Sequence, residues 1–67
     1  MTDVEKLKCA IKESGIPISE ISRRSGILRE TLYNRFDTGD FKVSEVEALS
    51  ITLKLTKKQR DDIFFAK

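Results

Sequence analysis

Apolar residues recur along this chain at spacings of three and four, which is the period of a helix with one buried face. Val4, Leu7 and Ile11 form the first such stripe and predict a helix over about residues 3 to 14. No stretch of useful length alternates apolar and polar residues, which is the pattern of a strand. The pattern therefore predicts an all-α chain.

Glycine and proline end the first two helices. Gly15 follows the first helix, and Pro17 prevents its continuation because proline lacks a backbone N–H and its ring clashes with the preceding turn. The second helix is expected to begin after Ile18 with Ser19 as its N-cap, and to end before Gly26. Gly26 is expected to adopt a positive φ in a tight turn.

Three further helices complete the pattern and predict a bundle of five short helices. They cover about residues 29 to 37, 45 to 53 and 57 to 65. Leu32 and Phe36 in the first of these lie four residues apart and therefore share its inner face.

The starts of three helices fit the S/T-x-x-E/Q capping box, in which two side chains satisfy free backbone N–H groups reciprocally. The pairs are Thr2 with Glu5, Ser44 with Glu47, and Thr56 with Gln59. The second and third helices lack such boxes, because Ser22 and Thr31 stand where Glu or Gln would be. Two interpretations stay open: these N-termini are left free for phosphate oxygens, or a box is simply optional there.

The inward positions of these helices predict one shared core. Phe41 and Val43 are expected to fix the connection before the fourth helix to that core. The predicted core residues are Val4, Leu7, Ile11, Ile16, Ile18, Ile21, Ile27, Leu32, Phe36, Phe41, Val46, Leu49, Leu53, Leu55, Ile63 and Phe64.

Length and charge narrow the class of protein. A chain of 67 residues predicts one small domain over residues 1 to 67, which must bury its apolar surface in a compact core. The net charge is only +2, but four arginines and one acid, Glu30, lie between Arg23 and Arg35. The excess positive charge therefore falls on one segment, which is typical of a surface that binds an anionic partner.

The candidate chemistry argues against an enzyme. The chain has no histidine and a single cysteine, Cys9, so it offers no intrachain disulfide and no Cys-based metal site. Cys9 is expected to be a partly buried packing residue, and Asp61 with Asp62 a solvated helix face. No cofactor or small-molecule ligand is indicated. Without a membrane-spanning run or signal-peptide pattern, a soluble cytoplasmic protein is expected.

Residues 18 to 36 are the most informative segment. They combine a short helix, a tight turn at Gly26, and a second helix that carries Arg29, Tyr33, Asn34 and Arg35. This is the outline of a helix-turn-helix, a motif that places its second helix in the major groove of DNA. Double-stranded DNA is therefore the expected partner.

The same segment resembles the repressor/Cro-type (lambda-repressor-like, XRE) helix-turn-helix regulators of phage and bacteria. The residues that carry the resemblance are Ser22, Gly26, Ile27, the run Arg29-Glu30-Thr31-Leu32-Tyr33-Asn34, the later Phe41 with Ser44-Glu45-Val46, and Asp62-Ile63-Phe64-Phe65. The resemblance implies a five-helix DNA-binding domain. Three features depart from the family. Leu28 stands where Ser or Thr often caps the recognition helix, and Ser22 stands where Ala is usual. The late core residue of the recognition helix is Phe36, one position after the usual place, where Arg35 stands. The Ser22 hydroxyl is expected to bond a backbone carbonyl one turn back.

The outward residues of the predicted recognition helix are candidates for contact with bases. Arg29 can donate two hydrogen bonds to guanine, Asn34 can pair with adenine, and Glu30 can accept from cytosine. Leu28 can touch a thymine methyl group, and Tyr33 lies beside these residues. The alternative for Arg29 is a solvated charge or a pair with Glu30 or Tyr33, and for Glu30 an exposed residue paired within the helix, for example with Asn34. Asn34 is alternatively a polar residue of the helix end, Tyr33 packs partly on the bundle, and Leu28 is an ordinary exposed apolar residue.

Six polar residues around the motif are candidates for contact with phosphates, which set affinity and register without reading sequence. They are Ser19, Arg23, Arg24, Thr31, Arg35 and Lys42. Their alternative is a solvated charged face, since surface charges usually contribute little.

The expected function is a sequence-specific DNA-binding regulator, a phage-type repressor that occupies an operator. A weak homodimer is expected, which forms either before DNA binding or only on DNA. Its candidate contact residues are Ile51, Phe64 and Phe65. The alternative is that the terminal aromatic residues fold back on the bundle. The alternative from another class is a small helical interaction module, similar to an anti-repressor or antitoxin, which lacks strong DNA affinity. RNA is a weaker rival, because no exposed aromatic platform is evident.

Overall fold

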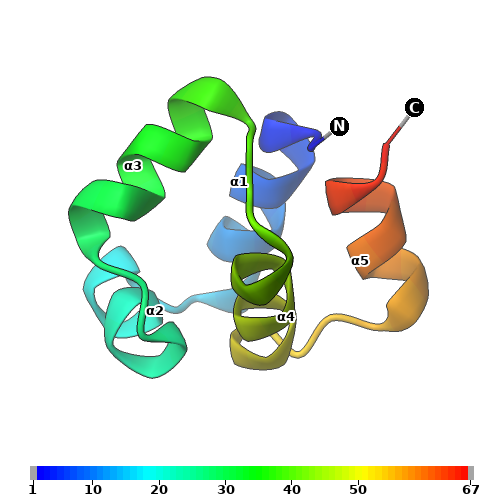
Figure 1. Cartoon of the computed structure of the whole chain (residues 1–67). Coiled ribbons are helices and arrows are strands. Elements are labelled where there is room, and N and C mark those ends of the chain that lie inside the picture. Colours follow the sequence, from blue (N-terminus) through cyan, green and yellow to red (C-terminus); the bar gives the residue numbers. More distant parts are fainter. Residues whose placement is uncertain (1, 67) are drawn as a thin grey trace.

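The computed structural model describes residues 2 to 66, and within them it is all-helical and compact (Figure 1). The five helices are α1 (Val4–Ser14), α2 (Ile18–Ser25), α3 (Arg29–Thr38), α4 (Val43–Thr52) and α5 (Lys57–Phe64). The radius of gyration is 10.5 Å, close to the roughly 11 Å expected for a folded chain of this length. The prediction of five short helices is confirmed.

The helix ends follow the glycines. α1, α2 and α3 each end at a glycine in the left-handed region, and Gly26 after α2 has φ +76° as predicted. In each case the glycine N–H donates to a carbonyl of the last turn, which satisfies part of the helix end. Short turns therefore separate the first four helices.

The helix starts correct two predictions about caps. Asp3, and not Thr2, caps α1: its carboxylate accepts from the Lys6 N–H at 3.1 Å. Pro17 precedes α2, so Ser19 lies inside the first turn and is not an N-cap. Proline is tolerated at this position because it precedes the first helical residue, where its missing N–H breaks no hydrogen bond of the helix.

The start of α4 corrects a third prediction. The helix begins at Val43, so the predicted pairing of Ser44 with Glu47 does not form. Glu45 instead accepts from the backbone N–H of Lys42 at 2.9 Å, which satisfies the donor just before the helix. Only the box at α5 is confirmed, where Thr56 and Gln59 bond reciprocally at 2.9 and 3.1 Å.

One hydrophobic cluster joins all five helices. Its buried members are Leu7, Ile21, Ile27, Leu32, Val46, Leu49, Leu53, Ile63 and Phe64, with Ala10, Ile11, Ile16, Ile18, Phe36, Phe41, Ala48 and Leu55 partly buried against it. Val4 is half-buried outside this cluster, which corrects its place in the predicted core. The earlier start of α4 turns Val43 outward and leaves it 82% exposed, so the prediction that it packs on the core was wrong.

Two further residues bear on the predicted burial. Phe64 is only 3% exposed and meets Phe41 edge-on at 5.5 Å, which confirms its place in the predicted core and removes it from the exposed surface expected for a dimer. Cys9 is exposed on α1, although a partly buried packing role was expected.

The arrangement leaves α3 at the edge of the bundle. α2 packs against α4 and α3, while α1 packs against α5, which in turn contacts α4 (Figure 1). The Asp3 N–H donates to the Ile63 carbonyl at 2.6 Å, which joins the start of α1 to the end of α5. One long side of α3 therefore faces away from all the other helices. No helix of residues 2 to 66 is long and apolar enough to cross a bilayer.

Candidate nucleic-acid interface

Two serines fix the turn between α2 and α3. The Ser22 hydroxyl donates to the Ile27 carbonyl at 2.5 Å, five residues ahead, which corrects the expected bond to a carbonyl one turn back. The Ser25 hydroxyl oxygen accepts from the Ile27 N–H at 3.2 Å. Because both polar groups of Ile27 are bonded and its side chain is buried, the entry to α3 is held at a defined angle.

Contacts on its inner side hold α3 against the bundle. Leu32 is fully buried, and Tyr33, Phe36 and Phe41 form a series of ring contacts with centroids 6.0 and 6.4 Å apart. Since Phe41 also meets the buried Phe64, this series runs from the side of α3 to the core. Tyr33 therefore packs partly on the bundle, as its alternative reading expected, while 52% of it remains exposed.

The outer side of α3 presents polar groups without partners. The side chains of Arg29, Glu30 and Asn34 are exposed and make no hydrogen bond or ion pair within residues 2 to 66. The intrahelical pairs considered as their alternative are thus not formed. Leu28 is 73% exposed at the entrance to the helix and has no side-chain cap, as its sequence indicated. All five predicted base-contacting residues consequently lie on exposed surface at the edge of the molecule.

Three of the predicted phosphate-contacting residues gather in one hollow. Thr31 and Arg35 from α3 and Lys42 before α4 line an open cavity of about 480 Å³, together with the turn before α3. Ser44 and Glu45 of α4 form its other wall. Polar groups from α3 and from the start of α4 therefore meet in one hollow beside the turn before α3.

Arg35 in this hollow is held by Glu45. Its Nε donates to the carboxylate at 3.0 Å, and both side chains are largely shielded from solvent. Burial acts to raise the pKa of Glu45, but the hydrogen bonds from Arg35 and from the Lys42 N–H outweigh it, so the pKa lies below its ordinary value. The same hydrogen bond raises the pKa of Arg35. This pair ties the end of α3 to the start of α4.

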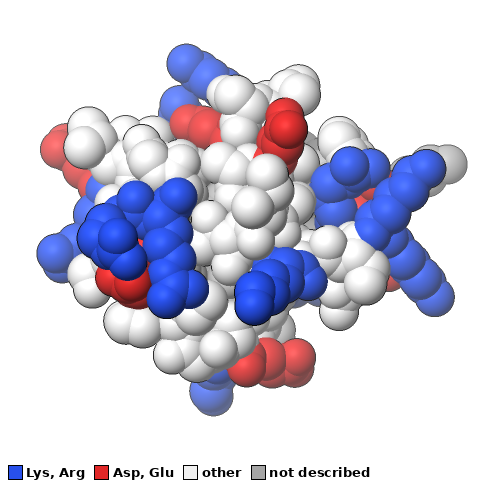
Figure 2. Space-filling model, turned by 90° about the horizontal axis from the view of Figure 1, so that it is seen from below, with Lys and Arg blue, Asp and Glu red and all other residues white. Residues whose placement is uncertain are grey.

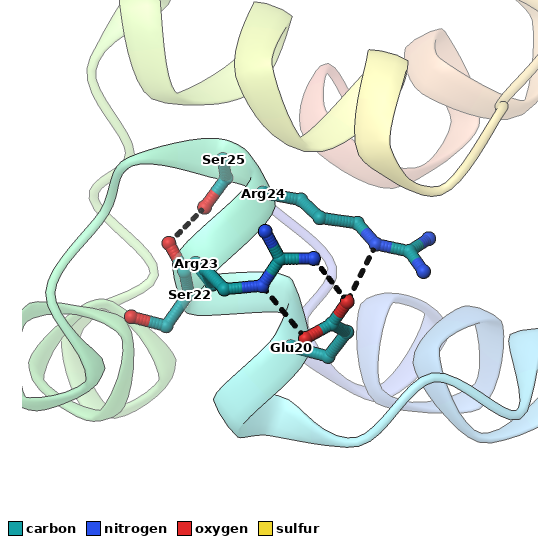
Figure 3. Close-up of polar contacts among 5 residues, drawn as sticks. All are labelled: Glu20, Ser22, Arg23, Arg24 and Ser25. Carbon is teal, nitrogen blue, oxygen red and sulfur yellow. Dashed lines mark hydrogen bonds and ion pairs between the residues drawn. The ribbon is translucent and has the colours of Figure 1, made fainter.

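The other predicted phosphate-contacting residues lie on α2, where Glu20 engages both arginines (Figure 3). Arg23 donates to the Glu20 carboxylate through Nε, at 2.9 Å, and through one terminal nitrogen, while Arg24 Nε donates at 3.1 Å. The hydrogen bond from Arg23 is the largest influence on the pKa of Glu20. Desolvation opposes it, but the hydrogen bond from Arg24 and the positive charges of both arginines add to it, so the pKa is lowered to about 2. Glu20 is therefore ionised at any neutral pH.

Glu20 and Glu45 are the functional-site residues that the sequence analysis missed. Spacings of three and four from Glu20 to Arg23 and Arg24 were a readable signal for its ion pairs. No comparable signal existed for Glu45, since its partner lies ten residues away. Figure 2 shows basic groups over α2 around an acidic one, and a second set of basic groups over α5.

Residues 2 to 66 contain no group of three or more His, Cys, Asp or Glu side chains placed to hold a metal ion. Comparisons of the chain with protein-family models, with curated proteins and with solved structures found no match.

Proposed function

We propose that this protein is a sequence-specific double-stranded DNA-binding regulator of the repressor/Cro type, which acts by occupying an operator. The observation that carries the proposal is the unpartnered polar side of α3, with Arg29, Glu30 and Asn34 free and the helix fixed behind by Leu32. A helix that is rigid on its inner side and unpaired on its outer side suits a recognition helix of a helix-turn-helix.

Base readout is assigned to the first two turns of α3. Arg29 is the candidate for two parallel hydrogen bonds to guanine, Asn34 for adenine, and Glu30 for the amino group of cytosine. Leu28 at the entrance suits a thymine methyl group. The carboxylate of Glu30 also repels phosphates, so it disfavours docking in which α3 sits out of register.

Phosphate contact is assigned to both sides of α3. The hollow beside Thr31, Arg35 and Lys42 suits one phosphate strand, with the free ammonium of Lys42 as its main charge. The guanidinium groups of Arg23 and Arg24 remain partly exposed, but a phosphate there must compete with Glu20. Non-specific affinity is therefore expected to be modest for a protein with so many basic residues.

Enrichment of random duplexes on the full-length protein tests this proposal. We expect a defined motif of a few base pairs per recognition helix, bound in a salt-dependent manner. Absence of binding to any duplex at low salt with near-stoichiometric protein would refute DNA recognition. Binding without any enriched sequence would leave only phosphate contact and would refute base readout.

A second candidate is a helical protein-interaction module. The specific observation in its favour is that Glu20 and Glu45 engage three of the four arginines near the motif, namely Arg23, Arg24 and Arg35. The same enrichment experiment separates the two candidates, because an interaction module retains its fold and shows no salt-dependent binding to duplex DNA.

A further inference from the structure

A second hollow lies between α1 and α5 and has no part in the proposed function. It measures about 350 Å³. One wall is α1, from Asp3 just before the helix to Glu13 in its last turn, and the other is α5 through Gln59, Asp62 and Ile63. No lining residue belongs to α3 or to the turn before it, and α5 lies on the opposite side of the bundle from α3 (Figure 1). We call this site the α1–α5 hollow.

The base of the α1–α5 hollow is apolar. Ile63 is 5% exposed and belongs to the core, and Ala10 is partly buried against the same cluster. Cys9 beside Ala10 carries a thiol, which behaves as a small apolar group. Because the side chains of α1 are short here, an apolar side chain of a partner can reach Ile63 and leave water there.

The rim of the hollow is acidic. Glu5, Glu13 and Asp62 are exposed, and their carboxylates make no hydrogen bond or ion pair within residues 2 to 66. Asp3 is a fourth acid, which already caps α1, and Lys6 is the one base among the lining residues. The net charge of the whole chain is +2, so this hollow has a charge opposite to that of the molecule that carries it.

This combination of charge and shape selects among partners. Nucleic acids and anionic lipid surfaces are repelled by the free carboxylates. A second copy that docked by a two-fold axis would bring the same acidic rim against itself, and Ile51 and Phe65, the exposed candidates for a dimer contact, lie outside the hollow. A basic segment that carries an apolar side chain satisfies both the rim and the base.

We propose that the α1–α5 hollow is a docking site for a basic amphipathic segment of another protein. The segment inserts an apolar side chain above Ile63 and places Lys or Arg beside the free carboxylates. Because these acids stand on both walls, basic residues flank the apolar anchor on both sides. The contact is small, so its affinity is modest and falls as salt rises. The site shares no residue with the proposed DNA-reading surface and does not rest on the proposed function.

Selection of random peptides displayed on phage, on the immobilised full chain and without DNA, tests the proposal without assuming a partner. We expect enriched peptides to carry Lys or Arg on both sides of an apolar residue. Synthetic copies are expected to bind in calorimetric titrations, more weakly at higher salt. Replacing their basic residues by Glu is expected to abolish binding, and replacing the apolar residue by Ser to weaken it.

Charge reversal on the protein locates the binding site. Glu5→Lys and Glu13→Lys are each expected to weaken peptide binding about threefold, and together about tenfold, because each replaces an attraction by a repulsion. Glu47→Lys on α4 is the matched control, since Glu47 is an exposed and unpartnered acid outside the hollow. Circular dichroism checks that the variants stay folded, as expected for exposed positions.

Cys9 allows the hollow to be blocked chemically. It is the single cysteine of the chain, it is exposed, and it lines the α1 wall. A bulky maleimide on Cys9 is expected to weaken peptide binding about tenfold or more, because it covers the apolar base. The same label on Glu47→Cys in a chain that also carries Cys9→Ser is the matched control and is expected to leave binding unchanged.

Four outcomes would overturn the proposal. Selection could enrich no peptide, or peptides without an excess of basic residues. Binding could respond to Glu5→Lys and Glu13→Lys no more than to Glu47→Lys. It could also survive the label on Cys9. Finally, the hollow could be filled by a second copy of the chain, which would appear as self-association that the label on Cys9 abolishes.

Discussion

At the scale of single residues, the arginines near α3 differ in what they already bind. Arg29 is unpartnered, whereas Arg23 is held by Glu20. Arg29→Ala is therefore expected to weaken binding to the preferred sequence by about 1–3 kcal/mol and to relax preference at one base pair. Arg23→Ala is expected to cause a smaller loss, equal for all sequences. Titrations of preferred and scrambled duplexes check this; equal losses for Arg29→Ala on both would contradict base readout.

The lowered pKa of Glu20 predicts a pH dependence of stability. Its folded pKa of about 2 lies below the ordinary value of 4.5, so its ion pairs stabilise the fold fully above pH 4.5 and are lost as pH falls toward 2. Glu20→Gln removes these ion pairs, so its melting temperature at pH 7 is expected to be lower than that of the unchanged chain. The difference is expected to be only a few degrees, because exposed ion pairs contribute little to stability. That difference is expected to vanish near pH 2. A difference that stays constant with pH would contradict this role.

At the scale of the elements, backbone conformation distinguishes two turn residues. Gly26 has φ +76°, and an added Cβ would meet no atom within 4 Å, so a side chain there costs only conformational strain. Lys54 after α4 has φ +55° without being a glycine. Gly26→Ala is expected to destabilise the fold by about 1 kcal/mol, and Lys54→Gly to stabilise it by roughly 0.5–1 kcal/mol. Urea unfolding measures both; the same sign for both changes would refute the argument.

The starts of the helices were harder to predict than their ends. A glycine that follows an apolar helical pattern most often ends the helix in the left-handed conformation. Gly15, Gly26 and Gly39 therefore marked the ends of α1, α2 and α3 correctly. Several Ser, Thr and Asp residues competed for each start, and the choice depended on neighbours. At α1 the cap is Asp3 and not Thr2. At α4 the helix starts earlier than predicted, and Glu45 in its first turn bonds to Arg35.

At the scale of the whole molecule, one small core supports every surface described above. Leu49 is fully buried and Leu49→Ala is expected to cost about 2–5 kcal/mol, while a domain of this size has only about 3–10 kcal/mol in total. Partial or complete unfolding at 37 °C is therefore expected. Ile51→Ala, two residues along the same helix and 70% exposed, should change the free energy of unfolding by no more than about 0.5 kcal/mol. Denaturant titration of both variants compares them; a similar loss for both would contradict the assigned core.

The sequence by itself determined the five helices, most of the core and the exposed side of α3. These features follow from periodicity, glycine placement and local spacing, which act within a few residues. Only the tertiary structure decided that Val43 faces outward and that Arg35 pairs with Glu45. Each of these features depends on contacts between different helices. Local spacing in the sequence does not encode such contacts, and a small shift in where a helix starts changes them.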